Sequence, residues 1–152
     1  MKNLSLLLCL ISLCGASACS ATAWHYAAGA GNVTELQQLI QTQPQNINQT
    51  DKDGFTPLHY AAYEGREAAI EILLDNGANT VINQADNDGG TPFYWAAFSG
   101  SVAAMAILLD RGATINLNQT EMREMTPLHR AARMGNLDVM EMFIRAYGRN
   151  NP

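Results

Sequence analysis

The heptapeptide TPLHYAA occupies residues 56–62, and two close copies follow it at a nearly constant interval. The copies read TPFYWAA at residues 91–97 and TPLHRAA at residues 126–132, and a degenerate version, TAWHYAA, occupies residues 22–28. The threonines that begin the four segments are 34, 35 and 35 residues apart. A period in this range indicates a stacked array of one supersecondary unit. The fold therefore depends on what a single unit forms.

The best copy of the unit, residues 51–83, begins with signals for a turn and a short helix. Residues 51–54 predict a turn, because aspartate opens the segment and glycine stands where a positive φ is favoured. Thr56 is expected to cap a helix, and Pro57 fills the first helical position, where its missing N–H is not needed. Gly65 is expected to end that helix.

The second helix of the unit is expected from about Glu67 to Asn76 and has one apolar face. That face carries Ile70, Leu73 and Leu74. One pair of helices cannot bury such a face alone, so four stacked pairs are expected to share a continuous core. The predicted fold is all-α, with four helix-turn-helix repeats joined by β-hairpin-type loops. The repeats are expected at about residues 20–50, 51–83, 84–116 and 117–148.

The repeated pattern resembles the ankyrin repeat family over roughly residues 22–147. The family pattern is DxxGxTPLHxAAxxG followed by IxxLLxxGA, and repeat 2 matches it from Asp51 to Ala78. Repeat 3 keeps the turn, the Thr-Pro start and the LLxxGA end, and repeat 4 keeps TPLHxAAxxG. The resemblance implies an ankyrin-repeat solenoid. Its hairpin tips and inner helices would form a concave surface that binds another protein.

Some positions depart from the pattern. Repeat 1 lacks the hairpin turn and has Ala23 in place of proline, as expected of an N-terminal cap. Extra residues at 79–84 and 114–119 are expected to lengthen the hairpin side. Glu124 replaces the turn glycine of repeat 4, and a side chain there costs about 1 kcal/mol in the left-handed conformation. We therefore expect that loop to be reshaped, and the alternative is that Glu124 is held there for contact.

The resemblance places partner binding at the variable positions of each repeat. These are the hairpin tips, the residue after the motif histidine and the two residues after Ala-Ala. They hold Lys52, Asp53, Phe55, Tyr60, Tyr63, Glu64, Asn87, Asp88, Trp95, Phe98, Met122, Arg123, Met125, Arg130, Arg133 and Met134. Aromatic residues, methionine and arginine are enriched at interfaces, so we expect an aromatic groove with an arginine-bearing C-terminal end. An alternative role for Tyr60 and Trp95 is half-buried packing between repeats.

Residues 1–18 are expected to form a secretory signal peptide that precedes the repeat domain at 19–152. Lys2 gives a positive start, an apolar run covers residues 4–13, and the small residues ASA at 16–18 suit a signal peptidase. The apolar run is too short to span a bilayer.

The cysteines agree with export. The three of them, Cys9, Cys14 and Cys19, lie within the signal or at its edge, so the mature domain has no disulfide framework and depends on its core. Cys19 directly follows the expected cleavage site and is an alternative lipid attachment site, as in bacterial lipoproteins. Membrane attachment is expected only in that case.

The acidic charge of the middle of the chain limits the partners. Residues 51–110 hold two basic and nine acidic residues, whereas residues 117–152 hold five arginines and four acids. Nucleic acids and anionic membranes both require positive surface, so neither is expected as a partner. A basic protein partner is permitted. The alternative is that the acidic surface only keeps the domain soluble.

No catalytic chemistry is expected. His25, His59 and His129 occupy the same repeat position, and an array keeps them about one repeat apart, too far to share a metal. The resemblance implies a structural role, in which each histidine bonds to backbone near the neighbouring turn. The sequence has no phosphate-binding loop, GxSxG elbow or HExxH motif. We expect no enzyme activity, metal or cofactor.

The leading hypothesis is therefore an exported, periplasmic module for protein–protein interaction, monomeric when unbound. By family analogy it would bind an exported enzyme and inhibit it or protect the cell against it. The alternatives are a secreted effector that binds a host or competitor protein, and an accessory factor of an oxidative-stress enzyme.

Overall fold

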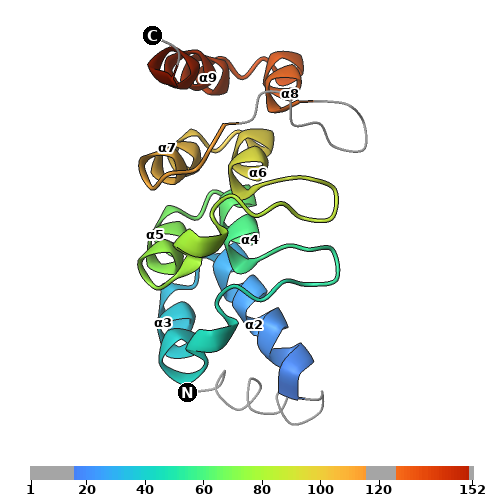
Figure 1. Cartoon of the computed structure of the whole chain (residues 1–152), viewed down its shortest axis with the longest axis vertical. Coiled ribbons are helices and arrows are strands. Elements are labelled where there is room, and N and C mark those ends of the chain that lie inside the picture. Colours follow the sequence, from blue (N-terminus) through green and yellow to red (C-terminus); the bar gives the residue numbers. More distant parts are fainter. Residues whose placement is uncertain (1–15, 116–125, 151–152) are drawn as a thin grey trace.

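The computed structural model describes residues 16–115 and 126–150, in which every regular element is helical. Helix pairs stack along the long axis in an inner and an outer layer (Figure 1). The inner helices are α2 (Ala16–Ala30), α4 (Pro57–Tyr63), α6 (Pro92–Ser99) and α8 (Pro127–Met134). The outer elements are α3 (Val33–Thr42), η1 (Pro44–Asn46), α5 (Glu67–Asp75), η2 (Ala78–Val81), α7 (Val102–Asp110) and α9 (Leu137–Asn150). The predicted all-helical fold of four stacked repeats is confirmed.

The Thr-Pro dipeptide starts the inner helices as predicted. The Thr56 hydroxyl accepts the N–H of His59 at 3.4 Å, and the Thr91 hydroxyl accepts the N–H of Tyr94 at 3.2 Å. Proline fits the next position, because the first turn of a helix has N–H groups without intrahelical partners. The loops that lead into α4 and α6 project from the same side of the stack, beside the inner layer (Figure 1).

Repeat 1 begins differently. Ala23 replaces proline, so nothing stops the helix at that point, and α2 starts at Ala16 and runs through Thr22 without using it as a cap. The helix crosses the peptide bond at which signal cleavage is expected, so cleavage there would leave the part from Cys19 to Ala30 in the domain. None of the helices in the described ranges has the length and hydrophobicity needed to cross a membrane.

The core lies between the repeats. Ala61, Ala62 and Ala96 are fully buried in the inner layer, where their small side chains let neighbouring helices approach closely. Branched and long apolar side chains of the outer layer, such as Ile70 and Leu108, are also fully buried. Each such large side chain contributes about 1.5–3 kcal/mol to folding, so stability comes from contacts between neighbouring units.

The motif histidine joins each repeat to the next hairpin. His59 Nε2 lies 3.1 Å from the Gly90 carbonyl oxygen, and His25 Nε2 lies 2.8 Å from the Phe55 carbonyl oxygen. His59 Nδ1 accepts the N–H of Thr56, so the ring is neutral and its Nε2–H donates to Gly90. The expected structural role is confirmed for His25 and His59, whereas His129, in the last repeat, is exposed.

The extra residues after α5 do not lengthen the hairpin. They form η2, and the following turn closes with the same bond as its predecessor, from the Asp86 N–H to the Gly90 oxygen at 2.9 Å. The side-chain amide of Asn48 binds the Thr80 hydroxyl at 3.0 Å, which joins successive loops on the outer side. The expectation of a longer hairpin side is therefore wrong here, and Glu124 lies outside the described residues.

Repeat 4 exposes positions that other repeats bury. Leu58 and Phe93 are 1% and 3% exposed, but the equivalent Leu128 is 36% exposed. Leu74 is fully buried, but the equivalent Ile144 is 69% exposed. These residues keep the apolar character of an internal repeat, and within the described residues no further helix pair packs against them.

The equivalent pair Leu74 and Ile144 tests whether stacking supplies the stability. Leu74→Ala leaves a cavity between repeats and should lower the free energy of unfolding by about 2–4 kcal/mol. Ile144→Ala removes an exposed side chain and should cost less than about 1 kcal/mol. Urea unfolding midpoints measure both changes, and equal losses would contradict the proposed core.

Acidification should destabilise the fold through His59. Burial lowers the pKa of His59 below its usual 6.5, and it outweighs the hydrogen bond to Gly90 and the charge of Asp86, which favour protonation. Below about pH 6.5, His59 binds a proton in the unfolded chain more readily than in the folded chain. The free energy of unfolding should therefore fall as the pH drops below about 6.5.

The measurement is urea unfolding between about pH 5.5 and 7.5, where carboxylates are largely ionised. His59→Gln should be less stable at neutral pH but should show a flatter dependence on pH. Identical slopes in the two proteins would mean that other groups cause the acid sensitivity.

Candidate functional site

Two aspartates shape the hairpins that border the inner layer. Asp51 Oδ1 accepts the N–H groups of Asp53 and Phe55, both at 2.9 Å. Asp86 Oδ1 accepts the equivalent N–H groups of the next hairpin at 2.8 and 2.9 Å. The carboxylates thus satisfy backbone donors that a tight turn leaves free, and both hairpins take the same form.

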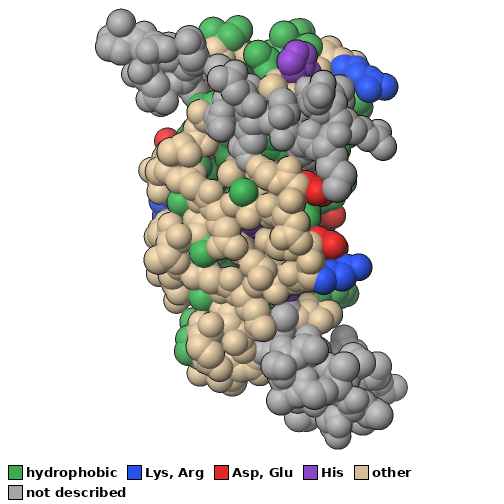
Figure 2. Space-filling model, turned by 45° about the vertical axis from the view of Figure 1, so that its right-hand side comes forward, with side chains coloured by type: hydrophobic (Ala, Val, Ile, Leu, Met, Phe, Trp, Pro, Cys, Tyr) green, Lys and Arg blue, Asp and Glu red, His purple; other side chains and the backbone are tan. Residues whose placement is uncertain are grey.

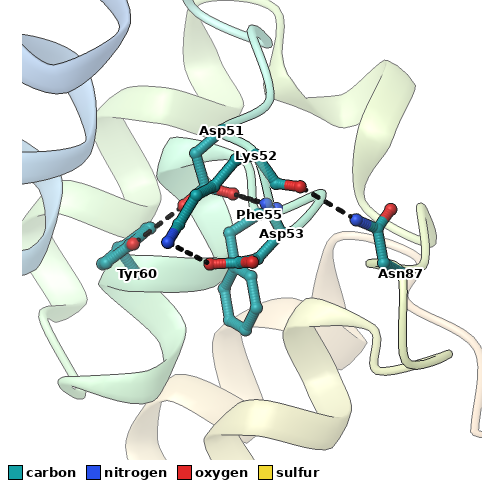
Figure 3. A network of polar contacts seen from close by, with 6 residues as sticks. All are labelled: Asp51, Lys52, Asp53, Phe55, Tyr60 and Asn87. Carbon is teal, nitrogen blue, oxygen red and sulfur yellow. Dashed lines mark hydrogen bonds and ion pairs between the residues drawn. The ribbon is translucent and has the colours of Figure 1, made fainter.

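The hairpin tips are bonded to each other. The Asn87 N–H donates to the Asp53 carbonyl oxygen at 3.1 Å, and the Asn87 side-chain amide donates to the Lys52 carbonyl oxygen at 3.0 Å (Figure 3). Gly54 permits this approach, since its φ is 84° and an added Cβ would lie 2.8 Å from the Asn87 nitrogen. The tips therefore form one continuous edge.

The second oxygen of each aspartate holds an aromatic ring of the inner helix. Asp51 Oδ2 accepts the Tyr60 hydroxyl at 2.9 Å (Figure 3), and Asp86 Oδ2 accepts the Trp95 indole N–H at 2.6 Å. Each carboxylate thereby joins the hairpin backbone to an inner-helix side chain. Charged hydrogen bonds of this kind are shorter and stronger than neutral ones.

These contacts shift the pKa values of Asp51 and Tyr60. Burial alone would raise the pKa of Asp51, but hydrogen bonds from Tyr60 and from the N–H groups of Phe55 and Asp53 hold it below its usual value. Burial, the bond to Asp51 and the negative charge of Asp51 raise the pKa of Tyr60 to about 12. The pair therefore stays as carboxylate and phenol near neutral pH.

Five aromatic side chains form a continuous row, which we call the aromatic ladder: Tyr60, Phe55, Trp95, Tyr63 and Phe98. Successive ring centroids lie 5.6, 5.2, 5.8 and 6.2 Å apart, and those of Trp95 and Phe98 lie 5.1 Å apart. Their tilted and edge-to-face geometries are the favourable ones for aromatic pairs. The ladder runs from repeat 2 to the end of α6 in repeat 3.

The ladder is both packed and accessible. Tyr63 is 40% exposed and Tyr60 36% exposed, while Phe55, Trp95 and Phe98 are half-buried. The packing role considered for Tyr60 and Trp95 is therefore present, and it positions rings that still reach the surface.

A pocket lies at the C-terminal end of the ladder, between α6 and α8. Its volume is about 260 Å³, which is smaller than the usual site for a small molecule and suits a single side chain. The lining residues are Ala97, Phe98, Ser99, Gly100, Ala131, Met134 and Asn136. Met134 is 69% exposed at its rim, so two of the predicted binding residues meet in this pocket.

The other predicted residues lie around the ladder or outside the described ranges. Exposed side chains at the hairpin tips and the ends of the inner helices are Lys52, Asp53, Glu64, Asn87, Asp88 and Arg133. Met122, Arg123 and Met125 lie outside the described residues, as does the side chain of Arg130. The expected arginine-bearing end of the groove is thus represented by Arg133.

Sequence reasoning missed the anchors of the ladder. The sequence predicts Asp51 and Asp86 only as turn residues and does not single out Asn136 of the pocket, whereas Ser99 is one of the two variable positions after Ala-Ala. The available signal was spacing, because Asp51 stands nine residues before Tyr60 and Asp86 stands nine before Trp95. No group of three or more histidine, cysteine or acidic side chains in the described part of the chain is arranged to hold a metal ion.

The stacked helix pairs with hairpins and an exposed row of aromatic side chains define a helical-repeat interaction protein. A family model for ankyrin repeats (3 copies) matches residues 1–86 and 80–151. The chain belongs to the ankyrin repeat family, whose members generally serve as non-catalytic modules for protein–protein interaction.

Curated relatives each match about a third of the chain. α-Latrotoxin-Lt1a of Latrodectus tredecimguttatus is 50% identical over 54 residues, which are 36% of this chain and 4% of the toxin. Protein phosphatase 1 regulatory subunit 12A of Mus musculus is 49% identical over 55 residues, again 36% of this chain and 5% of that protein. Ankyrin repeat family A protein 2 of Mus musculus is 46% identical over 55 residues and is covered to 17% of its length. The chain thus spans a small fraction of each relative.

Substitutions of Asp86 and Asp88, two acidic residues of one hairpin, test whether Asp86 anchors that hairpin and Trp95. Asp86→Ala leaves the Trp95 N–H and two hairpin N–H groups without their acceptor, and should lower the free energy of unfolding by about 2–3 kcal/mol. Asp88→Ala removes an exposed carboxylate from the same hairpin and should change it by less than about 0.5 kcal/mol. Urea unfolding measures both variants, and similar losses would show that Asp86 is not an anchor.

Proposed function

We propose that this protein binds another protein through the aromatic ladder and the adjoining pocket, without catalysing a reaction. The observation that carries the proposal is the continuity of this surface, which joins exposed rings of repeat 2 and half-buried rings of repeat 3 to a side-chain-sized pocket. Clustered, partly desolvated aromatic residues are the usual centres of binding energy in protein interfaces. The rings are already held by packing and hydrogen bonds, so little entropy is lost when a partner binds.

We further propose that the protein acts outside the cytoplasm, in the periplasm, on an exported enzyme that it inhibits or against which it protects. Residues 1–18 have the charge, apolar run and small-residue site of an export signal, which supports this location. One matched relative is by name a regulatory subunit of an enzyme, which accords with a regulatory role. If Cys19 is lipidated, the protein is held at the membrane surface instead of being free.

A photoreactive amino acid at position 63 tests the binding surface. In a periplasmic extract, the variant with benzoylphenylalanine in place of Tyr63 should cross-link to a discrete partner. The same group in place of Ala103, an exposed residue of the outer helix α7, should not. Tyr63 is 40% exposed, so the replacement should leave the fold intact, which thermal unfolding would confirm.

The companion variant is Tyr63→Ala, which should weaken capture of that partner on an affinity column at least about tenfold, as for an interface hot spot. Equal cross-linking from positions 63 and 103, or capture unaffected by Tyr63→Ala, would show that the partner does not bind the ladder. Addition of the purified protein to the captured enzyme then tests inhibition.

A further inference from the structure

Carboxylates border the aromatic ladder, and few cations balance them. Residues 51–110, which contain the whole ladder, hold nine acidic and two basic residues. Both basic side chains already lie beside acids: Lys52 Nζ is 3.9 Å from Asp53, and Arg66 is 4.0 Å from Glu64. Acidic side chains gather along one edge of the stack in the space-filling view (Figure 2). A partner that approaches the ladder therefore meets a negative field.

The rings themselves add to this field. The face of an aromatic ring is its negative region, and the edge is positive. Trp95 and Tyr60 direct their positive edges, the indole N–H and the phenol O–H, at the carboxylates of Asp86 and Asp51. The negative face of the exposed Tyr63 ring, beside these two rings, can attract a cation.

We infer that the segment recognised by this surface presents arginine side chains, which stack on the exposed ring of Tyr63 and pair with the bordering carboxylates. This inference rests on the proposed function and specifies the chemistry of the partner. Tyr63 is well exposed, Phe98 is half-buried beside the pocket, and Glu64 follows Tyr63 directly at the end of α4.

Arginine fits the surface better than lysine. Its guanidinium is planar and more weakly hydrated than an ammonium, so it loses less hydration when it stacks on a ring. It also offers several N–H donors in one plane, which can reach a carboxylate while the plane rests on an aromatic face. An acidic segment would meet like charges at Asp53, Asp88 and Glu64, and would be repelled.

Three matched peptides test the inference on the full-length protein. Each carries a fluorescent label and alternates glycine with arginine, with lysine or with citrulline, which keeps the shape of arginine without its charge. Fluorescence anisotropy should give the tightest binding for the arginine peptide, weaker binding for lysine, and at least about tenfold weaker binding for citrulline. Equal affinities for arginine and citrulline, or no binding of the arginine peptide at low salt, would overturn the inference.

Variants separate stacking from bulk charge. Tyr63→Leu keeps apolar volume but removes the exposed ring face, and should weaken binding of the arginine peptide by about five- to thirtyfold. Glu64→Gln should also weaken binding of the arginine peptide. Glu71→Gln makes the same charge change on the outer helix α5 and should leave that binding unchanged. If Glu64→Gln and Glu71→Gln have equal effects and the leucine variant has none, binding is non-specific attraction and the inference fails.

The test also distinguishes this inference from the proposed function. A partner cross-linked at position 63 can be digested, and the cross-linked peptide identified by mass spectrometry. A partner peptide with arginine at the linked segment supports both statements. A linked segment without arginine, together with failure of the arginine peptide, leaves the protein-binding function and removes the inference. Absence of any cross-linked partner removes the proposed function itself.

Discussion

A repeat of this protein buries its apolar face only against its neighbours, because two short helices enclose no core of their own. The constraint explains why Ala61, Ala62 and Ala96 are fully buried in the inner layer, where small side chains set the helix spacing. It also explains why Leu128 and Ile144 become exposed in repeat 4 although their equivalents are buried. Every further feature of the molecule, including the surface, is built on this stacking.

The aspartates of the hairpins connect that stacking to the surface. Each uses one oxygen for the turn backbone and the other for a ring on the inner helix. The histidine of each preceding inner helix binds a backbone carbonyl oxygen of the same hairpin. A hairpin is therefore fixed to two repeats, and the ring beside it is fixed with it. The accessible surface gains its shape from the same bonds that stabilise the array.

Local signals predicted much of this arrangement. Thr56 with Pro57 starts α4, and glycine stands at the positive-φ positions of the hairpins, because these effects act over a few residues. The start of α2 at Ala16 and the use of residues 78–81 for η2 differ from expectation. In both cases the local signal was weak: repeat 1 lacks proline, and extra loop residues carry no indication of which side they join.

The sequence by itself determined the repeated unit, its helices and the positions that vary between repeats, because a fixed period and the capping residues act locally. It also placed Tyr63, Phe98 and Met134 among those variable positions. Only the tertiary structure decided that the rings form one row and that the row ends in a pocket between α6 and α8. Those features join residues about one repeat apart in the chain, and their distances follow from the stacking of the helices rather than from any local signal.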